Sequence, residues 1–235
     1  MKKWSYICRF WPIYLLSACI LLSMVLCTSQ TVTTIAQNSP IPRVNTIVID
    51  AGHGGEDGGA TSCTGVLESM FNLQICLRLN DLCHLLGMDT VMIRTSDISV
   101  YTEGNTIAAK KASDLRQRVK IVSDTQNAIL VSIHQNTFPD GRYSGAQVFY
   151  ASTGGSIELA KTLQDMFVKT INPNSKRRCK PADYVYLMQH IPCPGVLIEC
   201  GFLSNAAEEA NLRSAEYQKK ICCVIVTGLS AYINA

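Results

Sequence analysis

Four side chains that could carry hydrolytic chemistry lie in four separate segments of this sequence. His53 stands in a glycine-rich stretch after an apolar run, and Glu68 stands at the start of an expected helix. His134 and Glu199 each stand at the end of a further apolar run. In open α/β sheets the carboxyl ends of the strands collect the ligand site, so His53, His134 and Glu199 would converge there.

These residue types suit a hydrolytic metal site. Two imidazoles and one carboxylate, with a fourth position left to water, are the ligand set of a catalytic zinc. Zinc lowers the pKa of its bound water to about 7 and polarises the scissile carbonyl, so that no covalent nucleophile is required. A second carboxylate is then needed to shuttle the proton. The four residues are 15, 66 and 65 positions apart, and no compact motif joins them.

Each of these residues also has a structural interpretation. A single histidine on an apolar strand is more often a hydrogen-bonded core residue than a metal ligand, and a glutamate that opens a helix favours the helix dipole. Glu199 is harder to explain in this way, because it follows the apolar run 194–198, where an unpaired charge would be costly. Residue types and spacing therefore leave zinc binding and a structural role both open.

The elements that would position these residues predict an α/β domain with a mostly parallel sheet. Short apolar, β-branched runs alternate with helical periodicity, which is typical of layered α/β folds. We expect about six strands, at residues 46–50, 90–93, 128–134, 146–150, 184–187 and 195–200. We expect helices at residues 67–86, 114–122, 156–170 and 216–232, with a loop from the third helix through residue 181. The apolar face of the first helix would consist of Leu73, Leu77, Leu79, Leu82 and Leu86.

The N-terminal part of the chain is typical of an exported protein. Residues 10–27 are almost continuously apolar, and basic residues but no acidic ones precede them. The length of this run lies between a long cleavable signal and a short membrane span, so we expect residues 1–27 to be a signal peptide or membrane anchor, and the length favours an uncleaved anchor. Residues 28–44 are polar and contain two prolines, which predicts a linker. Residues 45–235 would form the catalytic domain.

The charge and cysteine content exclude two classes of function. Outside the first 27 residues the chain has 18 basic and 18 acidic residues, so no basic stripe indicates nucleic acid as a partner. The 11 cysteines are odd in number, and those beyond the apolar run form no CxxC pair. We therefore expect small buried apolar residues or free thiols instead of a disulfide framework or a structural zinc site.

From Thr46 to the C-terminus, the order of motifs resembles the zinc-dependent N-acetylmuramoyl-L-alanine amidases of type 3. The segments that carry the resemblance are TIVIDAGHGGEDGGA, LESMFNLQICLRL, DLRQRVKIV, LVSIHQNTFP, GAQVFY and PGVLIECGFLSNAAEE. The resemblance implies that His53, Glu68 and His134 bind Zn²⁺ and that Glu199 is the catalytic carboxylate.

One branch of this family is especially similar. A single catalytic domain behind a membrane segment, together with GAQVFY and YVYLMQHIPCPG, resembles the germination-specific spore-cortex amidases. This implies hydrolysis of the amide between N-acetylmuramic acid and L-alanine in cortex peptidoglycan, followed by muramic lactam formation. It also implies an extracytoplasmic location around the developing spore and, as for some family members, an activating protein partner. A zinc peptidase that cuts the stem peptide and a non-catalytic wall-binding module are the alternatives.

Four further sites complete the predictions. Asn136 is expected to bind substrate, and so is His190, which precedes the Glu199 strand and would otherwise be a surface residue. Arg118 stands where the family has an arginine, and we expect it to form a structural salt bridge. The basic run 176–178 predicts a solvated loop that could meet anionic wall polymer.

Overall fold

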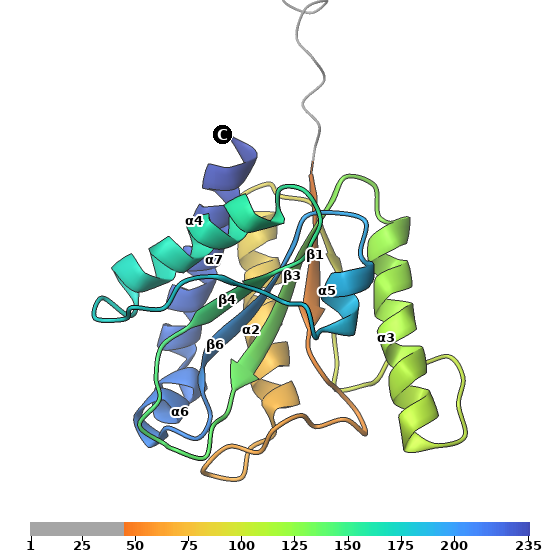
Figure 1. Cartoon of the computed structure of the whole chain (residues 1–235), viewed down its shortest axis with the longest axis horizontal. Helices are drawn as coiled ribbons and strands as arrows, with labels where there is room; N and C mark the ends of the chain where they lie inside the picture. The colour runs from red at the N-terminus through yellow and green to blue at the C-terminus, as the bar shows by residue number, and fades with distance from the viewer. Residues whose placement is uncertain (1–44) are drawn as a thin grey trace, which may run out of the picture. The chain divides into compact units, whose positions relative to one another are not determined.

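A six-stranded twisted sheet forms the centre of the computed structural model, which describes residues 45–235 (Figure 1). The strands are β1 (Thr46–Ala51), β2 (Thr90–Met92), β3 (Ala128–Asn136), β4 (Gln147–Tyr150), β5 (Lys180–Pro181) and β6 (Gly195–Phe202). Their order in the sheet is β2-β1-β3-β6-β4-β5, and the β4–β6 pair is the antiparallel one. The expected mostly parallel sheet is therefore confirmed.

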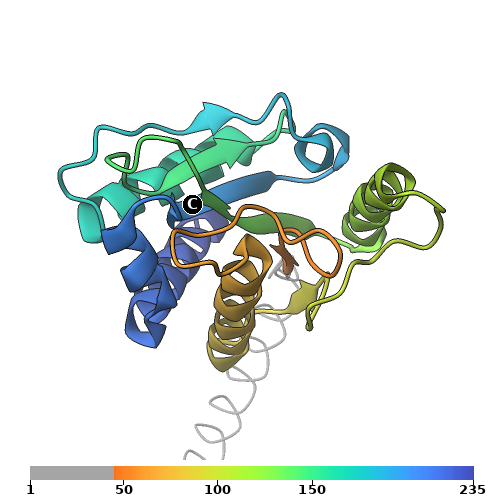
Figure 2. The same cartoon turned by 90° about the horizontal axis from the view of Figure 1, so that it is seen from below.

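Helices cover both faces of this sheet. They are α2 (Glu68–Leu85), α3 (Ile107–Asp124), α4 (Ser156–Thr170), α5 (Tyr186–His190), α6 (Ala206–Arg213) and α7 (Ala215–Ile233). Helices α2, α4 and α7 pack on one face, whereas α3 and the short α5 lie on the other (Figure 2). The second face is consequently the less covered one.

The alternation of side chains along the strands decides which residues meet which helices. Ile47 and Ile49 of β1 face the core under α2, α4 and α7, and Val48 faces the core under α3 and α5. Leu130 and Leu197 share the face of Val48. By the same alternation His134 on β3 and Glu199 on β6 project toward the less covered face, near the carboxyl ends of their strands.

One predicted strand is a helix. Residues 184–187 were expected to extend the sheet, but Tyr186–His190 form α5. Leu187, Met188 and Ile191 are all buried in the core under α3 and α5. Neighbouring residues of a strand point to opposite faces, so burying this set together requires a helical turn. The outer edge of β4 is instead paired by β5, at the end of the segment predicted to be a loop.

The remaining differences concern helix lengths and faces. Helix α3 begins seven residues earlier than expected, because Thr106 caps its first turn by accepting a hydrogen bond from the Ala109 N–H. Helix α6 was not expected, and Asn205 caps it by accepting from two N–H groups. In α2 the predicted apolar face is partly wrong. Leu77 and Leu86 are 38% and 57% exposed, because the buried face includes the small side chains of Cys76 and Cys83.

The N-terminal predictions fall on residues 1–44. The expected signal or anchor and the expected linker therefore lie outside the described residues. Between residues 45 and 235, no helix combines the length and the apolar character needed to cross a bilayer.

Candidate metal centre

Three parallel neighbouring strands bring the predicted site residues to one edge of the sheet. His53 follows the end of β1, and the middle strand β3 carries His134 near its end. Glu199 of β6 is the register partner of His134. Glu68 comes from the first turn of α2, so the chain contributes all four predicted chemical groups to this edge.

His53, Glu68 and His134 form a compact group. One nitrogen or oxygen atom from each lies within 4.8 Å of the others. His53 Nε2 is 3.3 Å from Glu68 Oε2, and His134 Nδ1 is 3.0 Å from Glu68 Oε1. The two imidazole rings meet edge to face, with centroids 5.0 Å apart. Among residues 45–235, no other group of three or more histidine, cysteine or acidic side chains is close enough to hold a metal ion.

Glu68 is held in place by hydrogen-bond donors. Its side chain is buried, and its two oxygens accept from the backbone N–H groups of Ala60, at 3.0 Å, and Gln135, at 3.1 Å. Asn72, one helical turn later, reaches Oε1 at 3.4 Å. Burial works against ionisation, but the hydrogen bonds from His134 and His53 hold the pKa of Glu68 far below its usual range. Glu68 is therefore a carboxylate at neutral pH.

His53 is fixed by contacts on both sides of its ring and on its backbone. Its φ of 61° is unusual for a residue other than glycine, and its carbonyl accepts a hydrogen bond of 2.8 Å from Arg118. Its Nδ1 lies 3.0 Å from Asp57 Oδ1, a charge contact without the alignment of a hydrogen bond. Burial opposes protonation, but Glu68 and Asp57 raise the pKa of His53. Carboxylates that favour a protonated imidazole also favour a metal cation between the rings.

Two glycines make room for this group. A Cβ on Gly52 would lie 2.2 Å from His134 Nε2, and a Cβ on Gly59 would lie 2.7 Å from Glu68 Oε2. Gly59 also has a φ of +69°, which other residues adopt rarely. The glycines around His53 thus allow the backbone to close over the ligand side chains. The donor set, its carboxylate neighbour Asp57 and this cradle fit a catalytic zinc, which takes histidine nitrogens and carboxylate oxygens.

Glu199 has a different environment from Glu68. Its Oε2 is buried and has no hydrogen-bond partner among the described residues, although part of the side chain reaches solvent. Burial raises the pKa of Glu199 to about 7, with His134 acting in the opposite direction and Glu68 adding to the rise. A carboxyl group with such a pKa can both accept and donate a proton near neutral pH.

A buried network supports the strand end below the group. Arg118 is 3% exposed and bonds to Asp50 Oδ1 at 2.5 Å and to Asp114 Oδ2 at 2.6 Å. It also donates to the carbonyl of Ala51, and Ser132 donates to Asp50 Oδ2 at 2.6 Å. The structural salt bridge predicted for Arg118 is therefore confirmed. A second buried arginine, Arg94, donates to the carbonyls of Ala51 and Gly52 and was not anticipated.

The two predicted substrate contacts lie outside the hydrogen bonds and ion pairs of this group. Asn136 ends β3 and is half-buried. His190 ends α5, where its side chain is exposed. Its Nδ1 donates a hydrogen bond of 2.8 Å to the carbonyl of Tyr186, and its ring stacks on the Tyr186 ring. Their contact with substrate stays a prediction.

Besides Arg94, two contributors to the site were missed from the sequence. Asp57 stands four positions after His53 in the same glycine-rich loop, and that spacing was the signal for it. Asn72 lies one helical turn after Glu68 and links Gly52 O, Glu68 and the Gln135 side chain. The eight cysteines beyond residue 44 are all free, and four of them are buried core residues.

Comparison with known proteins places this geometry in context. A family model described as N-acetylmuramoyl-L-alanine amidase matches residues 47–231. The germination-specific N-acetylmuramoyl-L-alanine amidase of Bacillus subtilis is 38% identical over 190 residues, which cover 80% of this chain and 79% of that protein. The amidase LytC of the same organism is 30% identical over 80% of this chain and 35% of its own length.

Solved structures show the same fold. The CwlD amidase from Clostridioides difficile, solved in complex with the GerS lipoprotein, superposes with a TM-score of 0.77 at 38% identity, covering 81% of this chain and 98% of that one. An N-acetylmuramoyl-L-alanine amidase from Clostridium difficile 630 superposes with a TM-score of 0.71 at 30% identity, covering 82% and 98% of the two chains.

Proposed function

This chain belongs to the N-acetylmuramoyl-L-alanine amidase family, enzymes that hydrolyse peptidoglycan, and we propose that it does so as a zinc enzyme of the spore cortex. The bond cleaved is the amide between the lactyl group of N-acetylmuramic acid and L-alanine. The observation that carries the zinc proposal is the convergence of His53, Glu68 and His134, with ligand atoms within 4.8 Å, beside a carboxyl group whose pKa is raised to about 7.

His53, Glu68 and His134 would hold the metal. A zinc ion bound there supplies Lewis-acid polarisation of the scissile carbonyl and acidifies a water molecule. The fixed carboxylate of Glu68 and the contact of Asp57 with His53 Nδ1 keep the ligand side chains oriented before substrate arrives. The buried guanidinium of Arg118 holds the backbone of His53 in its unusual conformation.

Glu199 would move the proton. Its unpartnered Oε2 is available to accept a proton from the attacking water, and its pKa lets it return that proton to the nitrogen of the departing L-alanine. Proton delivery to this nitrogen matters because an amine is a poor leaving group without it. Glu199 is therefore assigned as the general base and acid, not as a fourth ligand.

The cortex assignment rests on the relatives. The germination-specific amidase of Bacillus subtilis and the CwlD amidase both share 38% identity with this chain. We propose that this protein likewise acts on spore-cortex peptidoglycan, outside the cytoplasm, with its N-terminal apolar segment as export signal or anchor. The presence of the GerS lipoprotein in the CwlD complex supports a lipoprotein or similar activating partner for this chain as well.

Mass spectrometry of peptidoglycan tests the reaction. The full chain, loaded with zinc, should release peptides that begin with alanine and leave a free lactyl carboxyl on muramic acid. A shortened stem peptide still attached to the sugar would instead identify a zinc peptidase. Binding to peptidoglycan with no new product, together with zinc below stoichiometric amounts, would identify a wall-binding module.

The metal content separates these outcomes from the lack of a partner. Inactive protein that holds one zinc per chain would point to a missing activator, and adding a candidate lipoprotein would then restore activity. Glu199→Gln is the matched control for the digestion, since it should bind zinc and release no peptide.

A further inference from the structure

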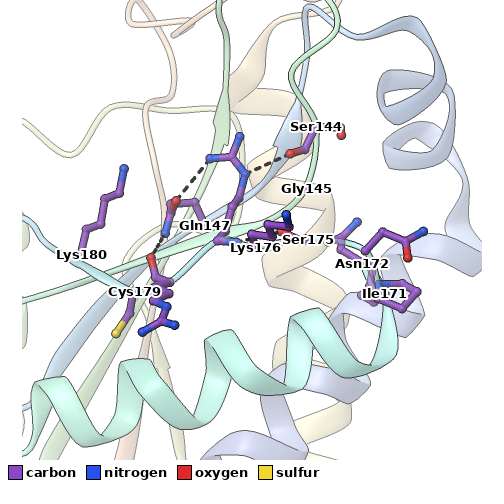
Figure 3. A pocket seen from close by; sticks show the side chains of 13 residues that line it. Ser144, Gly145, Gln147, Ile171, Asn172, Ser175, Lys176, Cys179 and Lys180 are labelled. Atoms are coloured by element: carbon purple, nitrogen blue, oxygen red, sulfur yellow. Dashed lines mark hydrogen bonds between the residues drawn. The ribbon is translucent and has the colours of Figure 1, made fainter.

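A basic cavity lies next to the metal centre along the same edge of the sheet. It has a volume of about 850 Å³ and is formed between residues 144–147, which lead into β4, and residues 171–180, which connect α4 to β5. Figure 3 shows lining residues from both segments, among them Ser144, Gly145 and Gln147 from the first and Asn172, Ser175 and Lys176 from the second. The basic run that was predicted to be a solvated loop forms one of its walls.

The charge of this cavity is one-sided. Its lining includes Lys176, Arg177, Arg178 and Lys180 but no aspartate or glutamate. None of these four cations takes part in an ion pair with a described residue. Asp165 lines an adjoining hollow on the α4 side, which shares Lys176, Arg177 and Arg178 with this cavity. The cavity therefore has a positively charged lining with no carboxylate among its own residues.

Arg177 is fixed in this cavity by neutral partners. Its Nε donates to Ser144 O at 3.0 Å and its Nη1 to Gln147 Oε1 at 3.3 Å, while its guanidinium lies 4.8 Å from the centre of the Phe202 ring. The nearby Glu208 carboxylate feels the charge of Arg177 but forms no ion pair with it, and accepts from the N–H groups of Gly145 and Phe202. Arg177 is thus oriented in advance and keeps donor capacity for an anion.

The cavity is within reach of the scissile bond. Gln147 is the register partner of Glu199, and His134 is the partner of Glu199 on the other side. Neighbouring strands are about 4.8 Å apart, so two strand spacings, roughly 10 Å, separate the His134 strand from the cavity wall on β4. An extended peptide covers this distance in about three residues. A substrate held at Glu199 can therefore place its peptide in the cavity.

We propose that this cavity binds carboxylates of the stem peptide, with Arg177 as the main contact and Lys176 and Lys180 adding to the positive field. This inference rests on the proposed function. In the uncleaved substrate the lactyl carboxyl of muramic acid forms the scissile amide and carries no charge. The anionic groups near the scissile amide therefore belong to the peptide. The cavity would then place the leaving group and select peptides with free carboxylates. Arg177 is a binding residue in this account, not a catalytic one.

The test compares two soluble substrates, a disaccharide peptide with free carboxylates and the same compound with its carboxylates blocked as amides. Arg177→Gln in the full chain should raise KM for the free substrate on the order of tenfold, the loss expected for one hydrogen bond to a charged group, with little change in kcat. The wild type should show a similarly raised KM for the blocked substrate, and Arg177→Gln should not raise the KM for the blocked substrate any further. Arg177→Lys should recover part of the loss, and Arg116→Gln, on exposed α3, should cause none.

Direct binding keeps this test separate from the proposed function. The released peptide, with a free N-terminal alanine and free carboxylates, should bind the wild-type chain in calorimetry and bind Arg177→Gln about tenfold more weakly, whether or not the protein is active. Equal losses on free and blocked substrates would make Arg177 a structural residue and overturn the proposal. Binding of a phosphate-rich wall polymer in preference to the peptide would also overturn it and assign the cavity to that polymer.

Discussion

Arg118 and Arg177 both lie near the edge of the sheet that carries the candidate site, but the groups around their charges differ. Arg118, beneath the candidate metal centre, is buried and bonded to Asp50 and Asp114, so its charge is neutralised inside the domain. Arg177, beside β4, is held by a carbonyl, an amide oxygen and an aromatic ring. A cation that is paired with carboxylates supports the backbone, whereas one that is fixed without an ion pair keeps donor capacity for a ligand.

The carboxylates follow the same rule. Glu68 accepts hydrogen bonds at both oxygens, and its pKa is held far below the usual range. Glu199 has a buried oxygen without a partner and a pKa raised to about 7. The satisfied carboxylate is suited to holding a cation, and the unsatisfied one is suited to moving a proton. The predictions below test this contrast between satisfied and unsatisfied groups.

The largest effect is expected from a candidate metal ligand. His134→Ala should remove most of the bound zinc and lower kcat/KM on the order of ten-thousandfold, because several kcal/mol of metal-derived stabilisation are lost. Zinc content by atomic absorption and product release by mass spectrometry measure both. His84→Ala, at an exposed position late in α2, is the control. Stoichiometric zinc in His134→Ala would remove this residue from the ligand set.

Glu199→Gln should separate chemistry from metal binding. The amide preserves the size of the side chain but cannot accept the proton, so kcat should fall on the order of a thousandfold while zinc content stays at the wild-type level. Glu216→Gln on the surface of α7 is the matched control. Turnover within about threefold of wild type would make Glu199 structural, and simultaneous loss of zinc would make it a ligand.

Asp50→Asn should affect folding more than chemistry. It leaves buried Arg118 short of one counter-charge, which should lower the free energy of unfolding by about 3 kcal/mol at pH 7. Burial opposes ionisation, but Arg118 holds the pKa of Asp50 below its usual range. The ionised form is thus favoured by folding, so the stabilisation is present above about pH 4 and is lost as the pH falls through the lower folded pKa.

Urea unfolding at pH 7 and pH 3 measures this dependence. The difference between wild type and Asp50→Asn should shrink at the lower pH. Asp124→Asn, which alters an exposed pair with Lys120 on α3, should change stability by less than about 1 kcal/mol at either pH. If the difference in the free energy of unfolding between the wild type and Asp50→Asn did not depend on pH, the ion pair would not be the source of that difference.

Asp57→Asn tests the contact behind the metal ligand. The neutral side chain keeps the shape but removes the charge beside His53 Nδ1, so zinc affinity should fall about tenfold to a hundredfold. Competition with a chromogenic chelator measures the affinity. An unchanged affinity would show that the loop backbone and Arg118 orient His53 without help from Asp57.

The smallest effect is expected at the rim of the basic cavity. Lys176 is exposed and unpaired among the described residues, so Lys176→Gln should raise KM only about two- to threefold, with an effect that fades in high salt. Kinetics at low and high ionic strength measure this, with Lys219→Gln on α7 as the control. A loss at Lys176 as large as that at Arg177 would contradict the distinction between a cation fixed by hydrogen bonds and an exposed one.

Much of the site could be predicted because it depends on strands with strong patterns. The apolar runs before His53 and around His134 and Glu199 indicate buried strands, and the rule for carboxyl ends then places their side chains together. That the three strands are direct neighbours does not follow from the runs themselves. The pairing of β6 with β3 is a choice among long-range partners that local patterns do not encode.

The wrong and missed predictions also concern contacts that local sequence patterns do not encode. Residues 184–187 carry two tyrosines and a valine, which favours a strand, yet the burial of Leu187 and Met188 on one face makes a helix there. Asp57 acts through a contact with His53 in the same irregular loop, and Arg177 acts through contacts with Ser144 and Gln147, which are distant along the chain. Their residue types are common on surfaces, so their type alone gives no signal for those contacts.

The position of β6 has a consequence for when the enzyme becomes competent. Strand β6 is the last of the described strands along the chain but lies between β3 and β4 in the sheet. During synthesis, the three candidate metal-binding side chains emerge from the ribosome long before Glu199 does, and the two halves of the sheet can join only after residues 195–202 have been made. A chain interrupted before β6 would carry the three candidate metal ligands without Glu199, the carboxylate proposed to move the proton. On this proposal, wall cleavage requires the chain through β6.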